Sequence, residues 1–342
     1  MGDRKIKCVV WDLDETVWKG VITEDATVAI RPEVVGFMRV LDERGILQSV
    51  CSKNDFEPAW SKLVEYGIAE LFLYPQINWN PKSDGIKKIV KSINIAFDAV
   101  AFVDDQEFER NEVNYELPEI LCIDAKDLNG FLDRDEMNPR FITEDSARRR
   151  QLYQSDIMRN QIEDSYPGTK EDFLKTLNMK LTIASACEKD LKRAEELTVR
   201  THQLNSTGVS YSYSQLRELI DSDDHEVLIV QLDDKYGTYG KIGLVLLEKE
   251  PSRWELKLLL MSCRVMSRGI GGLLLSYLVN QAAKNNVELF ARFVPNERNR
   301  IMYMTYKFGG FLEFEKNEDF VLLKADMSKL REMPNYLEIV EG

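Results

Sequence analysis

The first third of the chain alternates short apolar runs with longer amphipathic segments, a pattern typical of a parallel sheet covered by helices. The segments between the runs predict helices, of which 33–44 begins after Pro32 and 82–92 carries apolar residues on one face. We therefore expect a doubly wound, Rossmann-like α/β domain, which binds ligands beyond the carboxyl ends of its strands. The apolar runs that predict its strands are 6–11, 46–51, 71–74, 99–103 and 120–123.

The rest of the chain has a different pattern. Residues 139–178 are polar and helix-forming, and they predict a helical connector between two domains. An antiparallel-looking block follows, with strands expected at 181–183, 227–231, 241–247, 255–261 and 289–294 and helices at 190–200 and 269–280. The expected organisation is an α/β domain over 1–138, the connector over 139–178, and an α+β domain over 179–342.

Composition narrows the class of protein. The 342 residues predict roughly two domains, and their net charge of −13 argues against nonspecific binding to nucleic acid. Five scattered cysteines without a Cys-x-x-Cys pair predict a reducing, cytoplasmic compartment. We expect no membrane partner, because no apolar run approaches the length of a membrane span and the N-terminal stretch reaches Asp12 too soon for a signal peptide.

Polar residues follow several of the predicted strands of the first domain. Asp12 and Asp14 stand two apart after the first strand, so both side chains can face one site. Clustered carboxylates of this kind favour Mg²⁺, which shares its shell with substrate phosphate. The residue types fit a nucleophile at Asp12, an acid and base at Asp14, and phosphate binding by a hydroxyl and an ammonium group. The other candidate residues are Ser52, Lys53, Asn54 and Lys82 for phosphate, and Asp104 and Asp105 for the metal.

These motifs, in this order, resemble those of the haloacid dehalogenase superfamily of phosphatases and phosphotransferases. The resemblance implies that Asp12 is the nucleophile and Asp14 the acid and base, and that Asp12, the Asp14 backbone carbonyl and Asp104 bind Mg²⁺. Taken singly, each residue is better explained as a turn or cap residue, and only the set in this order favours a site. The intervals between motifs leave room for a short flap at 17–20 but for no large cap domain, so we expect an open site.

A second candidate site lies in the α+β domain. A glycine-rich turn at the start of a helix suits a phosphate group, although it also fits an ordinary strand-to-helix turn. Cys263, at the preceding strand end, is a candidate acyl carrier or a buried, inert thiol. His202 and Asn205 are possible acyl-site residues, and His202 could equally be structural. This region resembles the acyl-CoA-binding core of the GNAT acyltransferases, which implies phosphopantetheine binding by Arg268, Gly269, Gly271, Asn299 and Tyr306. Met266 departs from that family's phosphate loop, so a carrier-protein arm replaces free CoA in our expectation.

Over nearly its full length the chain resembles the FkbH-like family, in which a haloacid dehalogenase-like half is joined to a GNAT-like half. The shared strings are 102–106, 140–145 and 261–265. The resemblance implies an enzyme of polyketide or related biosynthesis that loads a glyceryl unit from 1,3-bisphosphoglycerate onto an acyl carrier protein. The alternatives are a plain Mg²⁺-dependent phosphatase acting on another phosphorylated metabolite and a noncatalytic scaffold that binds a carrier protein.

Overall fold

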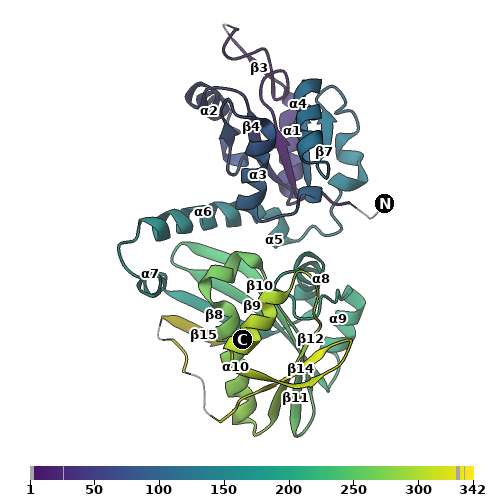
Figure 1. Cartoon of the computed structure of the whole chain (residues 1–342), viewed down its shortest axis with the longest axis vertical. Coiled ribbons are helices and arrows are strands. Elements are labelled where there is room, and N and C mark those ends of the chain that lie inside the picture. Colours follow the sequence, from purple (N-terminus) through teal and green to yellow (C-terminus); the bar gives the residue numbers. More distant parts are fainter. Residues whose placement is uncertain (1–3, 26, 329–331, 335) are drawn as a thin grey trace. The chain divides into compact units, whose positions relative to one another are not determined.

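The computed structural model describes residues 4–25, 27–328, 332–334 and 336–342 (Figure 1). Clustering of contacts divides the chain into two compact units, unit 1 from Met1 to Gln154 and unit 2 from Ser155 to Gly342. Each unit has a sheet of its own, and each is described by itself below. No helix among the described residues is both long enough and apolar enough to cross a membrane.

Unit 1 is built on a parallel sheet, which among the described residues has the strand order β5-β4-β1-β6-β7. Its strands are apolar and buried because helices cover the sheet, and β1 is buried along its whole length. This order confirms the expected doubly wound, Rossmann-like α/β fold. The strands are β1 (Cys8–Trp11), β4 (Leu47–Ser52), β5 (Gln76–Ile77), β6 (Val100–Asp104) and β7 (Leu121–Asp124).

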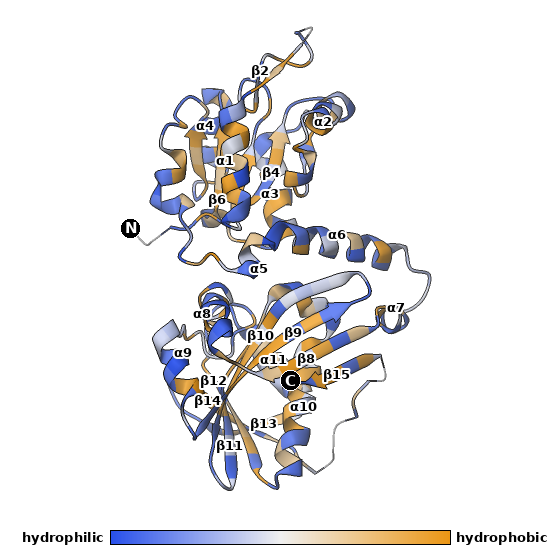
Figure 2. Cartoon of the chain, turned by 180° about the vertical axis from the view of Figure 1, so that it is seen from behind, coloured by the Kyte–Doolittle hydropathy of each residue, from blue (hydrophilic) through white to orange (hydrophobic). Residues whose placement is uncertain are grey.

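The helices of unit 1 follow the strands in the expected alternation. A small hairpin of β2 (Trp18–Lys19) and β3 (Ala29–Ile30) forms the flap. Figure 2 shows apolar residues concentrated in the strands and polar residues along the outer helices. The helices are α1 (Pro32–Glu43), α2 (Phe56–Glu65), α3 (Lys82–Ile93) and α4 (Glu107–Glu116), with 3-10 turns η1 (Ala69–Leu71), η2 (Phe97–Ala99), η3 (Phe131–Asp133) and η4 (Asp135–Met137).

The strand predicted at 71–74 is wrong. This segment leaves η1 and makes only one bridge to the sheet, between Phe72 and Gln48. Tyr74 has a left-handed backbone with φ of 52° and is followed by Pro75, so an extended ladder cannot continue through this point. Pairing with β4 resumes two residues later, in β5.

Unit 2 contains a mixed sheet, which among the described residues has the order β13-β14-β12-β11-β10-β9-β8-β15. This α+β architecture is the one expected for the second domain. Its strands are β8 (Met179–Ser185), β9 (His225–Asp234), β10 (Gly237–Lys249), β11 (Arg253–Met261), β12 (Glu288–Phe293), β13 (Phe311–Lys316), β14 (Val321–Ala325) and β15 (Leu337–Glu341). Its helices are α8 (Leu191–Arg200), α9 (Tyr213–Ile220), α10 (Ile270–Lys284) and α11 (Arg300–Phe308), with turns η5 (Glu188–Asp190) and η6 (Cys263–Arg268).

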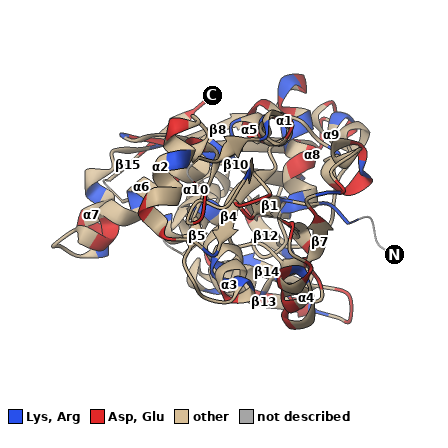
Figure 3. Cartoon of the chain, turned by 90° about the horizontal axis from the view of Figure 1, so that it is seen from above, with Lys and Arg blue, Asp and Glu red and all other residues tan. Residues whose placement is uncertain are grey.

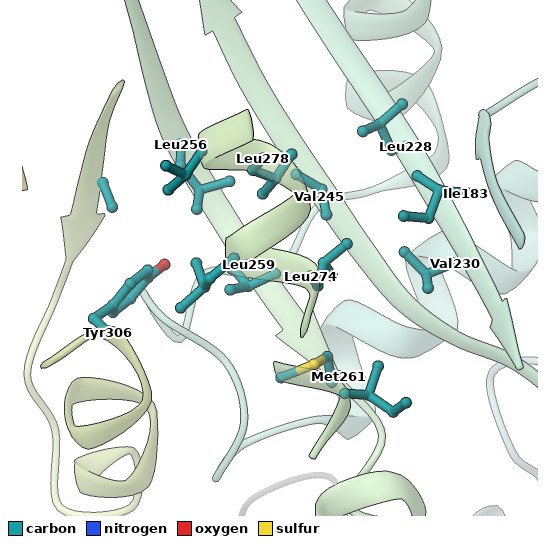
Figure 4. Close-up of a cluster of buried hydrophobic side chains, with 14 of the residues drawn as sticks. Ile183, Leu228, Val230, Val245, Leu256, Leu259, Met261, Leu274, Leu278 and Tyr306 are labelled. Carbon is teal, nitrogen blue, oxygen red and sulfur yellow. The ribbon is translucent and has the colours of Figure 1, made fainter. Parts of the chain in front are cut away.

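The main core of unit 2 lies between the sheet and the apolar faces of α10 and α11. Figure 4 shows Leu274 and Leu278 facing Val245 and Leu259 of the sheet, with Tyr306 at one side. All five side chains are at most 1% exposed. This packing fixes the turn that precedes α10, where the second candidate site is expected.

Strands β11 and β12 separate beyond their first four residues. They pair in parallel only over Arg253–Leu256 and Glu288–Ala291. Further along, the segment 204–206 enters the gap: Ser206 N donates to Leu259 O at 2.9 Å, and Met261 N donates to Leu204 O at 2.9 Å. Val294 N, just after β12, donates to Ser206 O at 2.9 Å. This segment, which we call the wedge, therefore hydrogen-bonds to the chain on both sides of the gap.

Residues 139–178 are distributed over both units. They form α5 (Glu144–Ala147), α6 (Arg149–Ser165) and α7 (Lys170–Thr176), and the boundary between the units falls inside α6. In unit 1, Arg150 pairs with Asp42 at 2.9 Å. In unit 2, Arg159 pairs with Asp234 at 2.8 Å, with both side chains fully buried. Each half of α6 is thus anchored within its own unit.

Candidate functional site

The first candidate site lies at the carboxyl edge of the sheet in unit 1. Asp12 follows β1 directly, Ser52 ends β4 and Asp104 ends β6. Since β4, β1 and β6 are neighbours and run in parallel, their carboxyl ends meet at one edge. Lys82 reaches the same place from the first residue of α3. The local fold thereby brings together side chains from four separate parts of the chain.

Lys82 is the central cation of this site. Its Nζ lies 2.7 Å from Oδ1 of Asp12 and also contacts Asp104. All three side chains are at most 5% exposed. Burial by itself lowers the pKa of Lys82, but the two carboxylates outweigh it and hold the pKa above its usual range. Burial, with the charge of Asp12, raises the pKa of Asp104 to about 6.

Three carboxyl groups gather around this cation. Oxygens of Asp12, Asp104 and Asp105 all lie within 4.8 Å of one another. Burial raises the pKa of Asp105, and its Oδ1 is buried without a hydrogen-bond partner in the part of the chain that the structure describes. A compact set of oxygen donors with one unsatisfied atom fits a hard divalent cation such as Mg²⁺. Asp12, Asp104 and Asp105 are three of the four predicted metal residues, and metal binding by them stays a prediction.

The Asp14 carboxylate has a different environment. Its Oδ1 accepts hydrogen bonds from Trp18 Nε1 at 2.7 Å and from Ile22 N at 3.2 Å, and its Oδ2 accepts one from Asn54 Nδ2 at 2.9 Å. The side chain is therefore set apart from the cluster of three carboxyl groups, as suits an acid and base. A metal contact through the Asp14 backbone carbonyl remains a prediction.

Ser52, Lys53 and Asn54 are the other residues predicted to bind phosphate, and each has a hydrogen-bond or ion-pair partner within the protein. Ser52 is buried, and its Oγ accepts a hydrogen bond from Asn54 Nδ2 at 3.1 Å. Lys53 pairs with the buried Glu109 at 2.7 Å and keeps about a third of its side chain exposed. Phosphate binding by Ser52, Lys53, Asn54 and Lys82 stays a prediction.

Cys51 lies directly beside this site, but its thiol is expected to be unreactive. It is 4% exposed, its Sγ lies 3.5 Å from Lys82 O, and burial raises its pKa to about 12. A thiol in this state forms little thiolate near neutral pH. This agrees with the expectation that Cys51 is the weaker candidate for an acyl carrier.

Cys263 is the first residue of η6, two residues after the end of β11, and it is partly exposed. The neighbouring Arg264 donates from its guanidinium to Tyr239 O at 2.8 Å. Gly269 has a left-handed φ of 72° and is the N-cap of α10, a conformation that favours glycine. Cys263 is therefore a partly exposed residue just after a strand end, and its role as acyl carrier stays a prediction.

The other predicted residues of this site are largely interior. Arg268 is 2% exposed and pairs with Glu163, and its guanidinium also donates to Asn160 Oδ1 at 3.3 Å. A Cβ on Gly271 would lie 2.7 Å from Met261 Cε, which is a packing reason for glycine there. Phosphopantetheine binding by Arg268 would require this ion pair to open.

Asn299 supports the wedge, and Tyr306 lies in the main core of unit 2. Asn299 Nδ2 donates to Asn205 O at 3.1 Å and to Val294 O at 2.9 Å, and both Asn299 and Asn205 are fully buried. Asn205 Oδ1 accepts from Thr207 N at 3.1 Å and Gly208 N at 2.8 Å. Tyr306 is fully buried, and burial raises its pKa well above the usual range. The two hydrogen bonds of Asn299 therefore join the wedge to the chain just after β12.

His202 differs from these residues because it is exposed. It lines a shallow hollow with Gly208, Asn296, Glu297 and Arg298. The structure therefore separates the two possible acyl-site residues, with Asn205 in the interior and His202 on the surface.

The sequence does not single out two residues of the first site. Trp18 is predicted only as part of the flap, and nothing in the sequence points to Glu109. Trp18 holds Asp14, and Glu109 holds Lys53. A glutamate five residues after Asp104, in the acid-rich α4 that Figure 3 shows, gives no signal of its partner. The four-residue spacing of Asp14 and Trp18 across a turn is a signal that could have been used.

A scan against family models finds no match for this sequence, and a search of curated proteins finds none either. Among solved structures, the N-terminal part of BF1531 from Bacteroides fragilis, which contains a phosphatase domain complexed with Mg, is 28% identical with a TM-score of 0.37. That match covers 40% of this chain and 41% of the other, so the similarity spans less than half of each.

Other similar structures are acetyltransferases. The ribosomal-protein-S18-alanine N-acetyltransferase from Escherichia coli is 18% identical with a TM-score of 0.35, over 44% of this chain and 97% of that one. A spermidine N-acetyltransferase SpeG chimera from Vibrio cholerae and hSSAT is 18% identical with a TM-score of 0.34, over 43% and 96%. The fold class is assigned from the strand order and connections described above.

Proposed function

We propose that the chain is a Mg²⁺-dependent enzyme that removes a phosphate group in unit 1 and transfers an acyl group through unit 2. The observation that carries the first part is the buried cluster in which Lys82 joins Asp12 and Asp104 beside Asp105. Carboxylates and an ammonium group at the carboxyl edge of a parallel sheet suit phosphoryl transfer through an aspartyl-phosphate. Asp12, Asp104 and Asp105 would hold the Mg²⁺, which would neutralise charge on the phosphoryl group.

In the proposed reaction, Asp12 attacks phosphorus while the bond to the leaving oxygen breaks. Asp14 gives its proton to that oxygen, and Lys82 and Ser52 hold the other phosphoryl oxygens. Asp14, now ionised, takes a proton from the water that attacks the aspartyl-phosphate. Inorganic phosphate leaves and Asp12 is restored, so the cycle consumes one water for each phosphate released.

The finer proposal is that the enzyme loads a glyceryl unit from 1,3-bisphosphoglycerate onto an acyl carrier protein. The Cys263 thiolate attacks the carbonyl carbon of the acyl phosphate, the bond from that carbon to the phosphate oxygen breaks, and inorganic phosphate leaves, which gives a thioester. The unit 1 site removes the phosphate from the 3-hydroxyl. The carrier's phosphopantetheine thiol then takes the glyceryl group and releases Cys263. This proposal rests on the partly exposed position of Cys263 after β11 together with the family resemblance.

The test combines phosphate release with intact mass spectrometry of the enzyme after incubation with Mg²⁺ and 1,3-bisphosphoglycerate. Asp12→Asn is expected to abolish enzymatic phosphate release from the 3-position, and Cys263→Ala is expected to remove the acyl adduct. Cys187→Ala is the control, because Cys187 is exposed and lies on the turn before α8. An adduct that survives in Cys263→Ala contradicts the thiol assignment, and release that survives in Asp12→Asn contradicts the nucleophile.

A further inference from the structure

The hydrogen bonds to Asp14 form a fixed cradle made of neutral donors. One oxygen accepts from an indole N–H and a backbone N–H, and the other accepts from a side-chain amide. The buried cation of the site, Lys82, contacts Asp12 and Asp104. The two aspartates of the first motif are thus held by different means.

Trp18 is a rigid donor because its ring belongs to the core. Its side chain is fully buried, and its ring centroid lies 6.4 Å from that of Tyr66. The turn after Asp14 brings it back, since Val17 N donates to Leu13 O at 2.8 Å. The indole Nε1 then points at Asp14 Oδ1 from the flap, four residues along the chain.

Asn54 links Asp14 to the phosphate-binding hydroxyl. Its Nδ2 donates to Asp14 Oδ2 at 2.9 Å and to Ser52 Oγ at 3.1 Å, and the side chain is 1% exposed. Because Ser52 Oγ accepts this bond, its own proton is left to donate to a phosphoryl oxygen. The amide group of Asn54 therefore orients both Asp14, which in the proposed function faces the leaving oxygen, and Ser52, which faces another phosphoryl oxygen.

We propose that Trp18 and Asn54 are positioning residues that hold Asp14 for proton transfer to the leaving oxygen. This inference rests on the proposed phosphatase function. As the bond between phosphorus and the leaving oxygen breaks, Asp14 gives up its proton and becomes a carboxylate. The N–H groups of Trp18, Ile22 and Asn54 are already aimed at the charge that develops, so the site needs no rearrangement at that moment.

The chemistry of the leaving group separates this role from a merely structural one. An alkoxide is a poor leaving group and needs the proton, whereas p-nitrophenolate leaves readily without it. A residue that acts through Asp14 therefore affects hydrolysis of an alkyl phosphate more than hydrolysis of an aryl phosphate. A residue that only supports the fold lowers both rates together.

The experiment measures kcat/KM for sn-glycerol 3-phosphate and for p-nitrophenyl phosphate with Mg²⁺, using the full chain. The variants are Trp18→Phe, Asn54→Ala and Asp14→Asn, and the ratio of alkyl to aryl activity is the readout. General acid catalysis contributes about 10²–10⁴-fold, so Asp14→Asn is expected to lower the ratio by about 100-fold or more. Trp18→Phe and Asn54→Ala are expected to lower it by about 10-fold, since each removes one of three donors.

Trp60→Phe is the matched control. Trp60 packs against the same core of unit 1 and stacks on Phe56, at 5.7 Å between ring centroids, so its replacement tests loss of a tryptophan without loss of a bond to Asp14. Its ratio is expected to equal that of the wild type. If Trp18→Phe does not fold, Asn54→Ala still decides the question.

Two outcomes separate this inference from the function on which it rests. Wild-type ratios in Trp18→Phe and Asn54→Ala, with a lowered ratio in Asp14→Asn, overturn the positioning role and leave the phosphatase assignment standing. A wild-type ratio in Asp14→Asn itself removes Asp14 as the acid, and with it the proposed mechanism.

Discussion

Oδ1 of Asp12 lies 2.7 Å from Nζ of Lys82, and each side chain is at most 5% exposed. A buried ammonium group beside a buried carboxylate is stable only because each compensates the other. Since Lys82 also contacts Asp104, it stands at the centre of the site's charge balance. The account of unit 1 depends on this relationship, and its energetic consequences can be measured.

Removing the positive charge of Lys82 should lower the free energy of unfolding of unit 1. Lys82→Met leaves Asp12 and Asp104 buried without their partner, which typically costs about 3–5 kcal/mol of unfolding free energy. Urea denaturation followed by circular dichroism measures the change, and added Mg²⁺ is expected to restore part of it by binding the same carboxylates. Lys87→Met on the same helix is the control, because its pairs with Asp84 and Glu116 are exposed. Equal stability of the two variants would contradict a buried charge cluster.

Mg²⁺ should bind through Asp105 as well as through Asp12 and Asp104. A cation at 100 times its Kd raises the free energy of unfolding by about 2.7 kcal/mol, which a thermal melt detects. Asp105→Asn is expected to weaken Mg²⁺ binding tenfold or more in calorimetry, since it removes a charged oxygen from the cluster. Asp84→Asn, in the exposed first turn of α3, should bind Mg²⁺ like the wild type. Unchanged affinity in Asp105→Asn would remove Asp105 from the metal site.

The cysteines should differ sharply in reactivity. Burial raises the pKa of Cys51 to about 12, so at pH 8 it is expected to resist iodoacetamide until the protein unfolds. Cys263 is partly exposed and is expected to be modified in the folded protein. Peptide mass spectrometry after brief labelling, with and without urea, measures both. Rapid modification of Cys51 in the folded protein would reopen it as an acyl carrier.

Two adjacent glycines in α10 should respond oppositely to alanine. At Gly271 a Cβ would lie 2.7 Å from Met261 Cε and 3.0 Å from Thr305 Cγ2, so Gly271→Ala is expected to destabilise unit 2 by about 1–3 kcal/mol. At Gly272 a Cβ meets nothing within 4 Å, so Gly272→Ala is expected to be neutral or to stabilise by up to about 1 kcal/mol. Denaturant melts of both variants give the comparison. A neutral Gly271→Ala would weaken the packing explanation for this residue.

Much of unit 1 could be predicted because its signals are local. Apolar strands end directly at polar residues, so the position of Asp12, Ser52 and Asp104 along the chain already implies the edge at which they meet. The strand at 71–74 could not be predicted correctly, because the left-handed backbone at Tyr74 depends on the turn as a whole. Asp14 accepts a hydrogen bond from Asn54, which lies 40 residues away in the sequence. A contact between residues so far apart leaves no periodic pattern from which it could be predicted.

Unit 2 was harder to predict because its key features are nonlocal. Asn299 is predicted as a ligand residue from its motif, and the structure shows that its side chain also hydrogen-bonds to Asn205 O of the wedge at 204–206. The wedge is recognised only when the separation of β11 and β12 is seen, since nothing in its own residues predicts a place between two strands. The short strands β13 and β14 are flanked by charged residues, so no clear alternation of apolar and polar positions predicts them.

The most direct test of the central proposal is intact mass spectrometry of a phosphopantetheinylated acyl carrier protein after incubation with the enzyme, Mg²⁺ and 1,3-bisphosphoglycerate. The account predicts that the carrier gains the mass of one glyceryl group, and that Asp12→Asn yields at most the phosphoglyceryl mass. A carrier that gains no mass while phosphate is released above the nonenzymatic background would contradict acyl transfer and leave a phosphatase.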